Sequence, residues 1–407
     1  MLTETTLIVC VFAAVFAGMA FGRVPRLRTE RSGIAFIGAA LLIVANGLGL
    51  DQAVDFIDLP TVLLLFGLMV LSAQFEVAGF YRLCAARIAS VSGSPAVLLA
   101  AVVGIAGGLS AVLANDIVVF AMTPLLCQGL LARGLDPRPY LIALACASNA
   151  GSAATLIGNP QNVFIGQAGE LAFGAFLAAC AAPALLALVL VYLGVWLTWR
   201  RALGEVGAAT QELAVEPLDR AEFYKALAAT ALLLALFMTG LRHEAIALVV
   251  VAALLLSRRI RTRTLLQRVD WPLLVLFGGL FVVTGSFAGT GLGQAAIAWL
   301  RGSGLEIAAP EVLASLSLVA SNTIGNVPAV LLLLSVWEAP GPESLYALAV
   351  FSTLSGNLLL TGSLANIIVA ERAASQGVSL GFLDFARSGL PITLASLLCA
   401  WAWFALL

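Results

Sequence analysis

The chain has 407 residues, of which 61% are hydrophobic and only 11% are charged, and its formal net charge is −1. Soluble globular proteins carry about 25% charged residues, so this composition excludes that class. The near-neutral charge provides no basic surface for nucleic acid. The six cysteines lack metal-binding spacing and are interpreted as small buried hydrophobic residues. We therefore predict an all-α polytopic membrane protein.

Three apolar stretches open the chain, and we expect membrane spans over about residues 5–22, 33–50 and 60–78. The connection after the first span is rich in arginine, whereas the next one carries aspartates and no basic residue. Basic residues concentrate in cytoplasmic connections, so the N-terminus is predicted to be external. The residues that set this orientation are Arg23, Arg26, Arg28 and Arg31 in the first connection and Asp51, Asp55 and Asp58 in the second.

Residues 95–131 form an apolar stretch of about 37 residues, which is too long for one span of about 20 residues and too short for two spans with a loop. Its middle carries Asn115 and Asp116, and basic residues flank both of its ends. The simplest solution is a re-entrant helical hairpin that enters and leaves on the cytoplasmic side, with Asn115 and Asp116 at its tip. The alternative is one long tilted helix that carries a buried carboxylate.

The stretch from about residue 140 to 166 is predicted to be a broken span. Its centre, Gly158–Asn162, reads GNPQN and combines three amide side chains with Pro160. Proline lacks a backbone donor and clashes with the preceding turn, so a helix should break here. Free backbone groups are tolerated at membrane depth only inside protein or beside a wet cavity, and transporters build their sites in this way. A plain span follows over about 171–199.

A polar stretch over residues 201–224 is interpreted as a cytoplasmic linker. It separates a first repeat, residues 1–200, from a second, residues 225–407. The second repeat opens with spans over about 225–241 and 245–256, and an arginine-rich connection follows them.

Landmarks of the first half recur in the second half at nearly constant spacing, which indicates an internal repeat. An Asp-x-Pro motif and a later glycine are separated from their copies by 212 residues, a hairpin asparagine by 211 and the broken pentapeptide by 204. The copies predict a second hairpin over about 308–336 and a second broken helix over about 345–370. The matched residues are Asp58, Pro60, Gly79, Asn115 and Gly158–Asn162 in the first half, and Asp270, Pro272, Gly291, Asn326 and Gly362–Asn366 in the second.

Charge sets the relative orientation of the two halves. Asp58 is expected outside, and Asp270, which follows the arginine-rich connection, is expected inside. The repeats are therefore predicted to be inverted, each with five transmembrane helices and one re-entrant hairpin. This gives about ten spans, two hairpins and two external termini. The hairpins and broken helices would then meet near the membrane midplane, where transporter sites lie.

Four strings, ANDIVVFAMTPL, SNAGSAATLIGNPQN, SNTIGNVPAVL and GNLLLTGSLANIIVAE, resemble the ion transporter superfamily. They are similar to the branch of arsenite permeases, P-protein relatives and bacterial inner-membrane anion permeases, and more distantly to divalent-anion sodium symporters. The resemblance covers nearly the whole chain. It implies an elevator-type secondary transporter, often dimeric, in which a transport domain of hairpins and broken helices slides against a scaffold domain.

The same resemblance implies roles for residues at the hairpin tips. Asn115 and Asp116 fall at the tip of the first hairpin, and Ser321–Thr323 reproduces the SNT signature that lines sodium and carboxylate sites in the symporters. The first hairpin has Ala114 before Asn115 and Asp116 instead of that signature, which resembles the arsenite permease pattern.

The candidate substrate or ion site consists of polar and turn residues at the tips and breaks. Asp116 either caps the second hairpin helix or binds a coupling proton or sodium ion. The amides either satisfy the backbone of the breaks or bind a small polar anion. A sodium ion would lie near Asn115, Asp116 and Asn322. The candidates are Asn115, Asp116, Gly158, Asn159, Pro160, Gln161, Asn162, Ser321, Asn322, Thr323, Asn326, Asn357, Thr361, Gly362, Ser363 and Asn366.

Two asparagines compete as the equivalent of Asn115 in the second half. The repeat spacing favours Asn326, and the SNT string favours Asn322. Ser148 and Asn149, which precede the first break, are predicted to be peripheral to the site.

The pattern as a whole predicts a secondary active transporter that moves a small anion or oxyanion, such as a dicarboxylate or an arsenite-like oxyacid, coupled to protons or sodium. The alternative is a sodium/proton antiporter without an anion substrate. The sequence holds no nucleophile with a base, HExxH helix or paired aspartates, so an enzyme is not expected. No cofactor is required. The expected setting is the cell's inner membrane, and the resemblance implies a homodimer.

Overall fold

The computed structural model describes residues 4–21, 29–45, 47–91, 94–203 and 217–406, and the regular elements of this part are helices. Six of the described helices are long and apolar enough to cross a membrane, and four shorter ones are also apolar. The count of ten spans stays a prediction. The six are α1 (Glu4–Phe21), α4 (Leu59–Val77), α6 (Pro95–Val112), α10 (Phe173–Trp199), α14 (Trp271–Ala288) and α20 (Phe382–Leu406), and the four are α2 (Arg31–Ala45), α7 (Asn115–Leu131), α12 (His243–Leu255) and α17 (Asn326–Val336).

The remaining helices include the pieces that interrupt or connect these spans. The predicted linker over residues 201–224 falls largely outside the described residues, as do Arg23, Arg26 and Arg28, and α11 begins within the linker's predicted bounds. These helices are α3 (Leu50–Asp55), α5 (Phe80–Ala89), α8 (Arg138–Ser152), α9 (Pro160–Ala168), α11 (Arg220–Phe237), α13 (Thr262–Leu266), α15 (Leu292–Gly302), α16 (Pro310–Ile324), α18 (Pro342–Ser355), η1 (Leu360–Gly362) and α19 (Leu364–Ala374).

Helices α4 and α14 begin with the same local chemistry. The Asp58 carboxylate accepts a hydrogen bond from the backbone N–H of Thr61 at 3.0 Å, and Asp270 accepts one from Leu273 at 3.0 Å. Aspartate is a preferred N-cap, and a proline in the first turn costs no helical hydrogen bond. Each helix is followed by a glycine with positive φ, +84° or +73°, that starts the short helix α5 or α15. The Asp-x-Pro and glycine landmarks of the repeat therefore build equivalent elements.

The two halves pack on each other reciprocally. Helix α4 packs against α12, and α14 packs against α2. A Cβ on Gly67 would lie 2.9 Å from the Cβ of Ala247, and one on Gly279 would lie 2.6 Å from the backbone carbon of Ala35. Small residues allow such close approach between membrane helices. The two glycines are 212 positions apart, and so are the two alanines that they contact. One contact is therefore the copy of the other in the repeat.

Both predicted hairpins turn where the repeat places them. Helix α6 ends at Val112 and α7 begins at Asn115, so the alternative of one long helix over residues 95–131 is wrong. In the second half, α16 and α17 are separated by Gly325 alone, whose φ of +95° favours glycine. Asn115 and Asn326 are each the first residue of the second hairpin helix. Asn326 is therefore the positional equivalent of Asn115.

Both broken helices are present, with the break slightly earlier than predicted. Residues 153–159 separate α8 from α9, and Pro160, Gln161 and Asn162 form the first turn of α9. Of the predicted pentapeptide, Gly158 and Asn159 lie in the break, whereas Pro160 begins the next helix, because a proline is tolerated at the first position of a helix. Residues 356–363 separate α18 from α19 in the same way, and Asn366 is helical.

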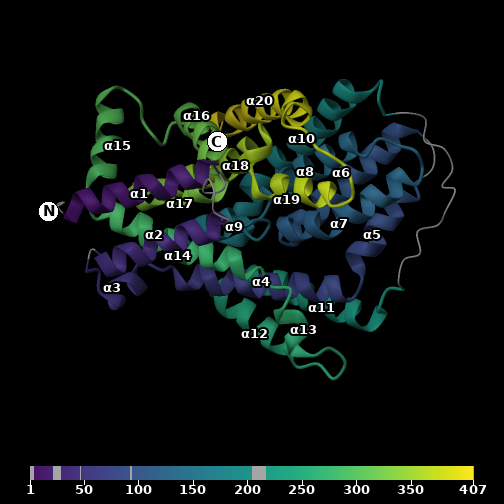
Figure 1. Cartoon of the computed structure of the whole chain (residues 1–407), viewed down its shortest axis with the longest axis horizontal. Coiled ribbons are helices and arrows are strands. Elements are labelled where there is room, and N and C mark those ends of the chain that lie inside the picture. Colours follow the sequence, from purple (N-terminus) through teal and green to yellow (C-terminus); the bar gives the residue numbers. More distant parts are fainter. Residues whose placement is uncertain (1–3, 22–28, 46, 92–93, 204–216, 407) are drawn as a thin grey trace.

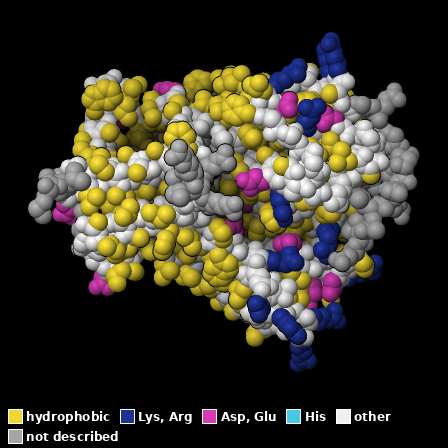
Figure 2. Space-filling view, in the orientation of Figure 1, with side chains coloured by type: hydrophobic (Ala, Val, Ile, Leu, Met, Phe, Trp, Pro, Cys, Tyr) yellow, Lys and Arg dark blue, Asp and Glu magenta, His cyan; other side chains and the backbone are white. Residues whose placement is uncertain are grey.

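The packing sorts the helices into two groups. The first, called the scaffold group, comprises α1, α2, α4, α11, α12 and α14; the second, called the hairpin group, comprises α6 to α10 and α16 to α20 with η1. In Figure 1, α11 and α12 lie beneath α4, whereas α20 lies at the top and α6, α7 and α8 lie to the right, above α11. Each group packs mainly within itself, and α5 and α15 lie between them. In Figure 2, Lys and Arg side chains gather over the right-hand part of the molecule, and hydrophobic side chains dominate the left-hand part.

Candidate functional site

The first break is held by the side chain of Asn162. Its Nδ2 donates to the carbonyl oxygens of Ser152 at 3.1 Å and Thr155 at 2.9 Å, which the end of α8 leaves unpaired. Asn159 caps α9, because its Oδ1 accepts from the backbone N–H of Asn162 at 2.9 Å. One amide thus joins the two halves of the broken helix.

Asn366 does the same at the second break. Its Nδ2 donates to the carbonyl oxygens of Gly356 at 2.7 Å and Leu359 at 3.1 Å. The donor and both acceptors each lie 204 positions after those of the first break. The backbone-satisfying role that the sequence left open is therefore realised by Asn162 and Asn366. Both are fully buried.

The two breaks are also bonded to each other across the halves. Asn159 Nδ2 donates to the Thr353 hydroxyl at 3.2 Å, and the Ser363 hydroxyl donates to Asn149 Oδ1 at 3.0 Å. Asn159 and Ser363 are 204 positions apart, as are Asn149 and Thr353, so these bonds form a reciprocal pair. Gln161 Nε2 also donates to Thr353, at 3.1 Å.

Asn149 is the centre of this buried polar network. Its Nδ2 donates to Asn357 Oδ1 at 2.9 Å and to Asn366 Oδ1 at 3.0 Å, and its Oδ1 lies 3.4 Å from Asn115 Nδ2. The side chain is fully buried. Asn149 was predicted to be peripheral to the site, yet it joins α7, α8, α19 and the second break. The signal that could have found it is its spacing of 204 from Thr353, a second polar residue inside an apolar helix.

Each hairpin tip is docked on the break of its own half. The backbone N–H of Asn115 donates to the carbonyl of Gly158 at 3.1 Å. In the second half, Asn322 Nδ2 donates to the carbonyl of Ser355 at 2.8 Å, and the Ser321 hydroxyl donates to that of Ser352 at 3.3 Å. The two tips and two breaks therefore form one connected polar core.

Gly158 and Gly362 allow neighbouring atoms to approach the backbone closely at the two breaks. A Cβ on Gly158 would lie 2.3 Å from the carbonyl oxygen of Ser152, and one on Gly362 would lie 2.5 Å from Asn322 Oδ1. Both distances are below van der Waals contact, so no side chain fits at either position without movement of the break.

Substitution of Gly158→Ala is expected to destabilise the hairpin group by about 2–4 kcal/mol, because strain against fixed backbone adds to the loss of the Asn162 bonds. The measurement is the unfolding temperature of the purified protein in detergent. Gly104→Ala in α6 is the matched control, since nothing lies within 4 Å of a Cβ there. A Gly158→Ala protein as stable as Gly104→Ala would contradict the close approach.

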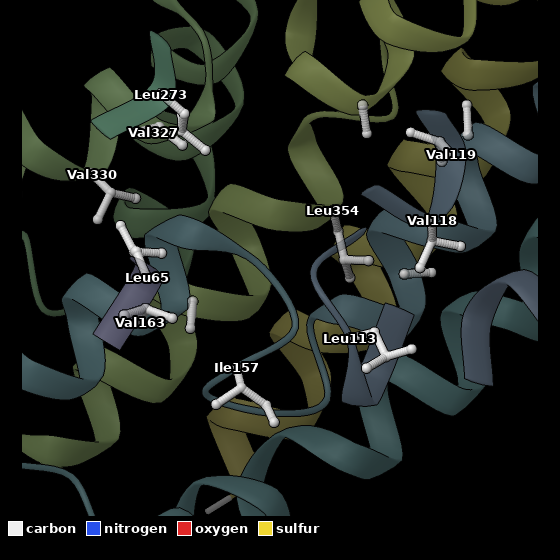
Figure 3. Packing of buried hydrophobic residues seen from close by; sticks show 14 of the residues in the cluster. Leu65, Leu113, Val118, Val119, Ile157, Val163, Leu273, Val327, Val330 and Leu354 are labelled. Carbon is white, nitrogen blue, oxygen red and sulfur yellow. The ribbon is translucent and has the colours of Figure 1, made fainter. Parts of the chain in front are cut away.

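Asp116 lies beside a small cavity between the two groups. The cavity of about 20 Å³, large enough for about one water, is lined by Asp116, Asn159 and Asp270 among apolar residues of α4, α9 and α14. Figure 3 shows Leu65, Val163 and Leu273 of this lining on one side of the view. The N-cap of α7 is Ala114 and makes no side-chain cap, so the alternative that Asp116 is the N-cap is wrong.

Three predicted residues stand apart from the network. The side chains of Thr323 and Thr361 are exposed, and the Thr323 hydroxyl donates to the carbonyl of Val319 in its own helix at 2.7 Å. Asn326 Oδ1 accepts only from the adjacent Val327 N–H at 3.0 Å. Within the described residues, no group of three or more acidic, histidine or cysteine side chains could hold a metal ion. A sodium site near Asn115, Asp116 and Asn322 stays a prediction.

Comparison with known proteins agrees with this architecture. The chain matches the family model described as CitMHS, citrate transporter, over residues 17–345. It is 30% identical over 455 residues to the silicon efflux transporter LSI3 of Oryza sativa subsp. japonica, with 92% of each chain covered. It is 27% identical over 495 residues to the P protein of Homo sapiens, covering 97% of this chain and 59% of that one.

A solved structure has the same fold. The Alcanivorax borkumensis YdaH transporter, whose crystal structure is described as having an unusual topology, superposes with a TM-score of 0.60 at 16% identity and covers 99% of this chain and 98% of its own. The family, the rice relative and the solved structure are described as transporters, and the six apolar helices give the membrane setting. The chain therefore belongs to the CitMHS citrate transporter family and is a multi-pass membrane transporter, not an enzyme.

Proposed function

We propose that the protein is a secondary active transporter of a small, oxygen-rich anion or oxyacid, coupled to protons or sodium. The observation that carries this proposal is the connected polar core, in which two broken helices and two hairpin tips meet through Asn149, Asn159 and Asn366. Half-helix ends beside buried polar side chains are the elements from which membrane transporters build substrate and ion sites. Such a core suits a ligand with several oxygen atoms.

The chemistry of relatives is consistent with this ligand class. The family is described as citrate transporters, and the rice relative is described as a silicon efflux transporter. Polycarboxylates and hydroxylated oxyacids share a dense set of oxygens, which hydrogen-bond with amides and hydroxyls. We infer that the substrate of this chain is a dicarboxylate, a tricarboxylate or an arsenite-like oxyacid.

We propose that the hairpin group moves past the scaffold group as an elevator. In support, the two groups meet through few helix pairs, and α5 and α15 connect them as equivalent elements of the two halves. Asp116 of the first hairpin faces Asp270, which follows the arginine-rich connection. If that connection is cytoplasmic, the hairpin group lies toward the cytoplasm, and this is an inward-facing state with both termini outside.

Asp116 is proposed as the coupling group. It is the ionisable residue of the hairpin group that lies nine-tenths buried beside a cavity, and ionisable groups inside membranes are costly and mark ion pathways. A second carboxylate, Asp270, faces the same cavity, which also suits exchange of sodium for protons. A sodium/proton antiporter is therefore retained as the second candidate.

Uptake by proteoliposomes tests the proposal. The panel contains citrate, succinate, arsenite and phosphate, each measured with and without a sodium gradient and a pH gradient. We expect gradient-driven accumulation of at least one oxygen-rich solute. If none accumulates and a sodium gradient instead drives proton flux, the anion transporter is disproved in favour of the antiporter. Solute flux without dependence on either gradient would contradict secondary active transport.

A further inference from the structure

Arg31 is a cationic residue beside the tip of the second hairpin. It is the first residue of α2 in the scaffold group, and its Nη1 lies 3.6 Å from the position that a Cβ on Gly325 would occupy. Gly325 is the turn residue between α16 and α17. Arg31 is mostly buried, although the described arginines of this chain otherwise mostly occupy exposed positions.

In the described part of the chain, the Arg31 guanidinium makes no hydrogen bond or ion pair that would explain its position. Its Nε is buried and donates no hydrogen bond, and no carboxylate of the described part of the chain lies within 4.0 Å. The side chain of Glu371 on α19 acts on it only through longer-range electrostatics. Arginine has five donors in a planar fork that matches carboxylate and oxyanion geometry. Leaving this fork unpaired in a partly buried place is costly, so a ligand is expected there.

The tip itself favours negative charge next to Arg31. Helix α17 begins at Asn326, which is 95% buried, and the partial positive charge of a helix N-terminus adds to that of the guanidinium. In the hydrogen bond with Val327 the Asn326 side chain uses its oxygen, so its Nδ2 is not engaged by that bond. The Arg31 guanidinium thus lies next to the turn at which α17 begins, at the boundary of the two groups.

Arg31 has no arginine counterpart at the equivalent position of the second half. The residue 212 positions after Arg31 is His243, the first residue of α12. His243 instead lines a small cavity with Leu156, Gly166 and Phe237, and its ring packs on Phe237 at 4.8 Å. If Arg31 served only to pack α2, a similar side chain would be expected at the equivalent position, 243, of the second half. The arginine beside His243, Arg242, is paired with Glu244 at 2.6 Å, so the unpaired cation stands at one end only, which points to a function that differs between the two sides of the membrane.

We propose that Arg31 and the tip of the second hairpin bind an ionised oxygen group, a carboxylate or an oxyanion, of the transported substrate. This rests on the proposed function and deepens it, because the substrate would then carry a negative charge. The site exists only while the hairpin tip lies at this end of the scaffold group. Arg31 therefore selects ionised over neutral oxyacids on this side of the membrane.

The test compares Arg31→Gln and Arg31→Lys with the wild-type protein in proteoliposomes of neutral lipid. We expect Arg31→Gln to raise the KM for succinate or citrate by about 10-fold or more, because a charge-assisted hydrogen bond is lost. Arg31→Lys should recover part of this loss. Uptake of arsenous acid, which is neutral at pH 7, should change by less than about 2-fold. Arg263→Gln in α13, an exposed arginine, is the matched control.

Other outcomes would overturn the assignment. Equal losses for the ionised and neutral solutes would show a structural role, and an unchanged KM for the anions would show no contact. If the effect of Arg31→Gln appears only with phosphatidylglycerol in the liposomes, the ligand is a lipid headgroup and not the substrate. Equilibrium binding of citrate to purified protein separates this inference from the proposed function. If citrate binds in an Arg31-dependent way but is not transported, the Arg31 site is supported and the proposed function is not. If citrate is neither bound nor transported, both the Arg31 site and the proposed function are disproved.

Discussion

Asn149→Ala is expected to abolish transport and to lower the stability of the folded protein. The substitution removes the donor to Asn357 and Asn366 and the acceptor for Ser363, and it leaves these buried groups unpaired. Each unsatisfied buried partner costs about 1–3 kcal/mol. Because the bonds join two halves of the chain, we expect a loss of at least about 2 kcal/mol and a lower unfolding temperature in detergent.

The control for Asn149→Ala is Thr230→Val. Thr230 is also buried, but its hydroxyl donates only to Ala226 of the same helix, α11, in the scaffold group. Thr353→Val tests the reciprocal position and should weaken the contacts of Asn159 and Gln161 to a smaller extent. If Asn149→Ala matched Thr230→Val in both stability and uptake, Asn149 would not join the breaks in the way described.

Asp116→Asn is expected to uncouple transport from the driving ion. Asparagine keeps the size and polarity of the side chain but cannot bind or release a proton at this position, and it binds sodium more weakly. We expect accumulation of substrate against its gradient to fall by about 10-fold or more, whereas exchange of labelled for unlabelled substrate continues. The measurement is the paired rate of accumulation and exchange in proteoliposomes with an imposed pH or sodium gradient.

The repeat supplies matched controls for Asp116→Asn. Asp58 and Asp270 both cap their helices, but only Asp270 lines the cavity with Asp116. Asparagine is also a good N-cap, so either substitution should leave its helix intact. Asp58→Asn should therefore be silent, and Asp270→Asn should shift the ion dependence of transport. Wild-type accumulation with unchanged ion dependence in Asp116→Asn would refute the coupling role.

Local chemistry made much of the fold predictable. The Asp-x-Pro starts of α4 and α14, the glycines that follow them and the hairpin turns depend on residues near in sequence. The chain's apolar composition fixed its class, and constant spacing between similar short motifs revealed the repeat. Even the misplaced first break followed from local chemistry, since Pro160 can either end a helix or begin one, and the sequence does not distinguish the two.

The polar core was only partly predictable. Asn159, Asn162, Ser363 and Asn366 stood out because they occupy the breaks, but Asn149 did not, since it lies within a regular helix. Its partners Asn357 and Asn366 are 208 and 217 positions away, and no local preference brings such residues together. The same holds for Asp116 and Asp270, which share a cavity only because the start of α7 lies beside α4 and the start of α14.

By itself, the sequence determined that this protein is a helical membrane transporter with a repeated plan, because hydropathy, helix ends and turns are properties of neighbouring residues. The tertiary structure decided that Asn149 joins the two breaks, that Asp116 and Asp270 share a cavity, and that Arg31 lies at the second hairpin tip. These depend on how the two halves pack, and packing between distant segments is set by the shapes of whole helices.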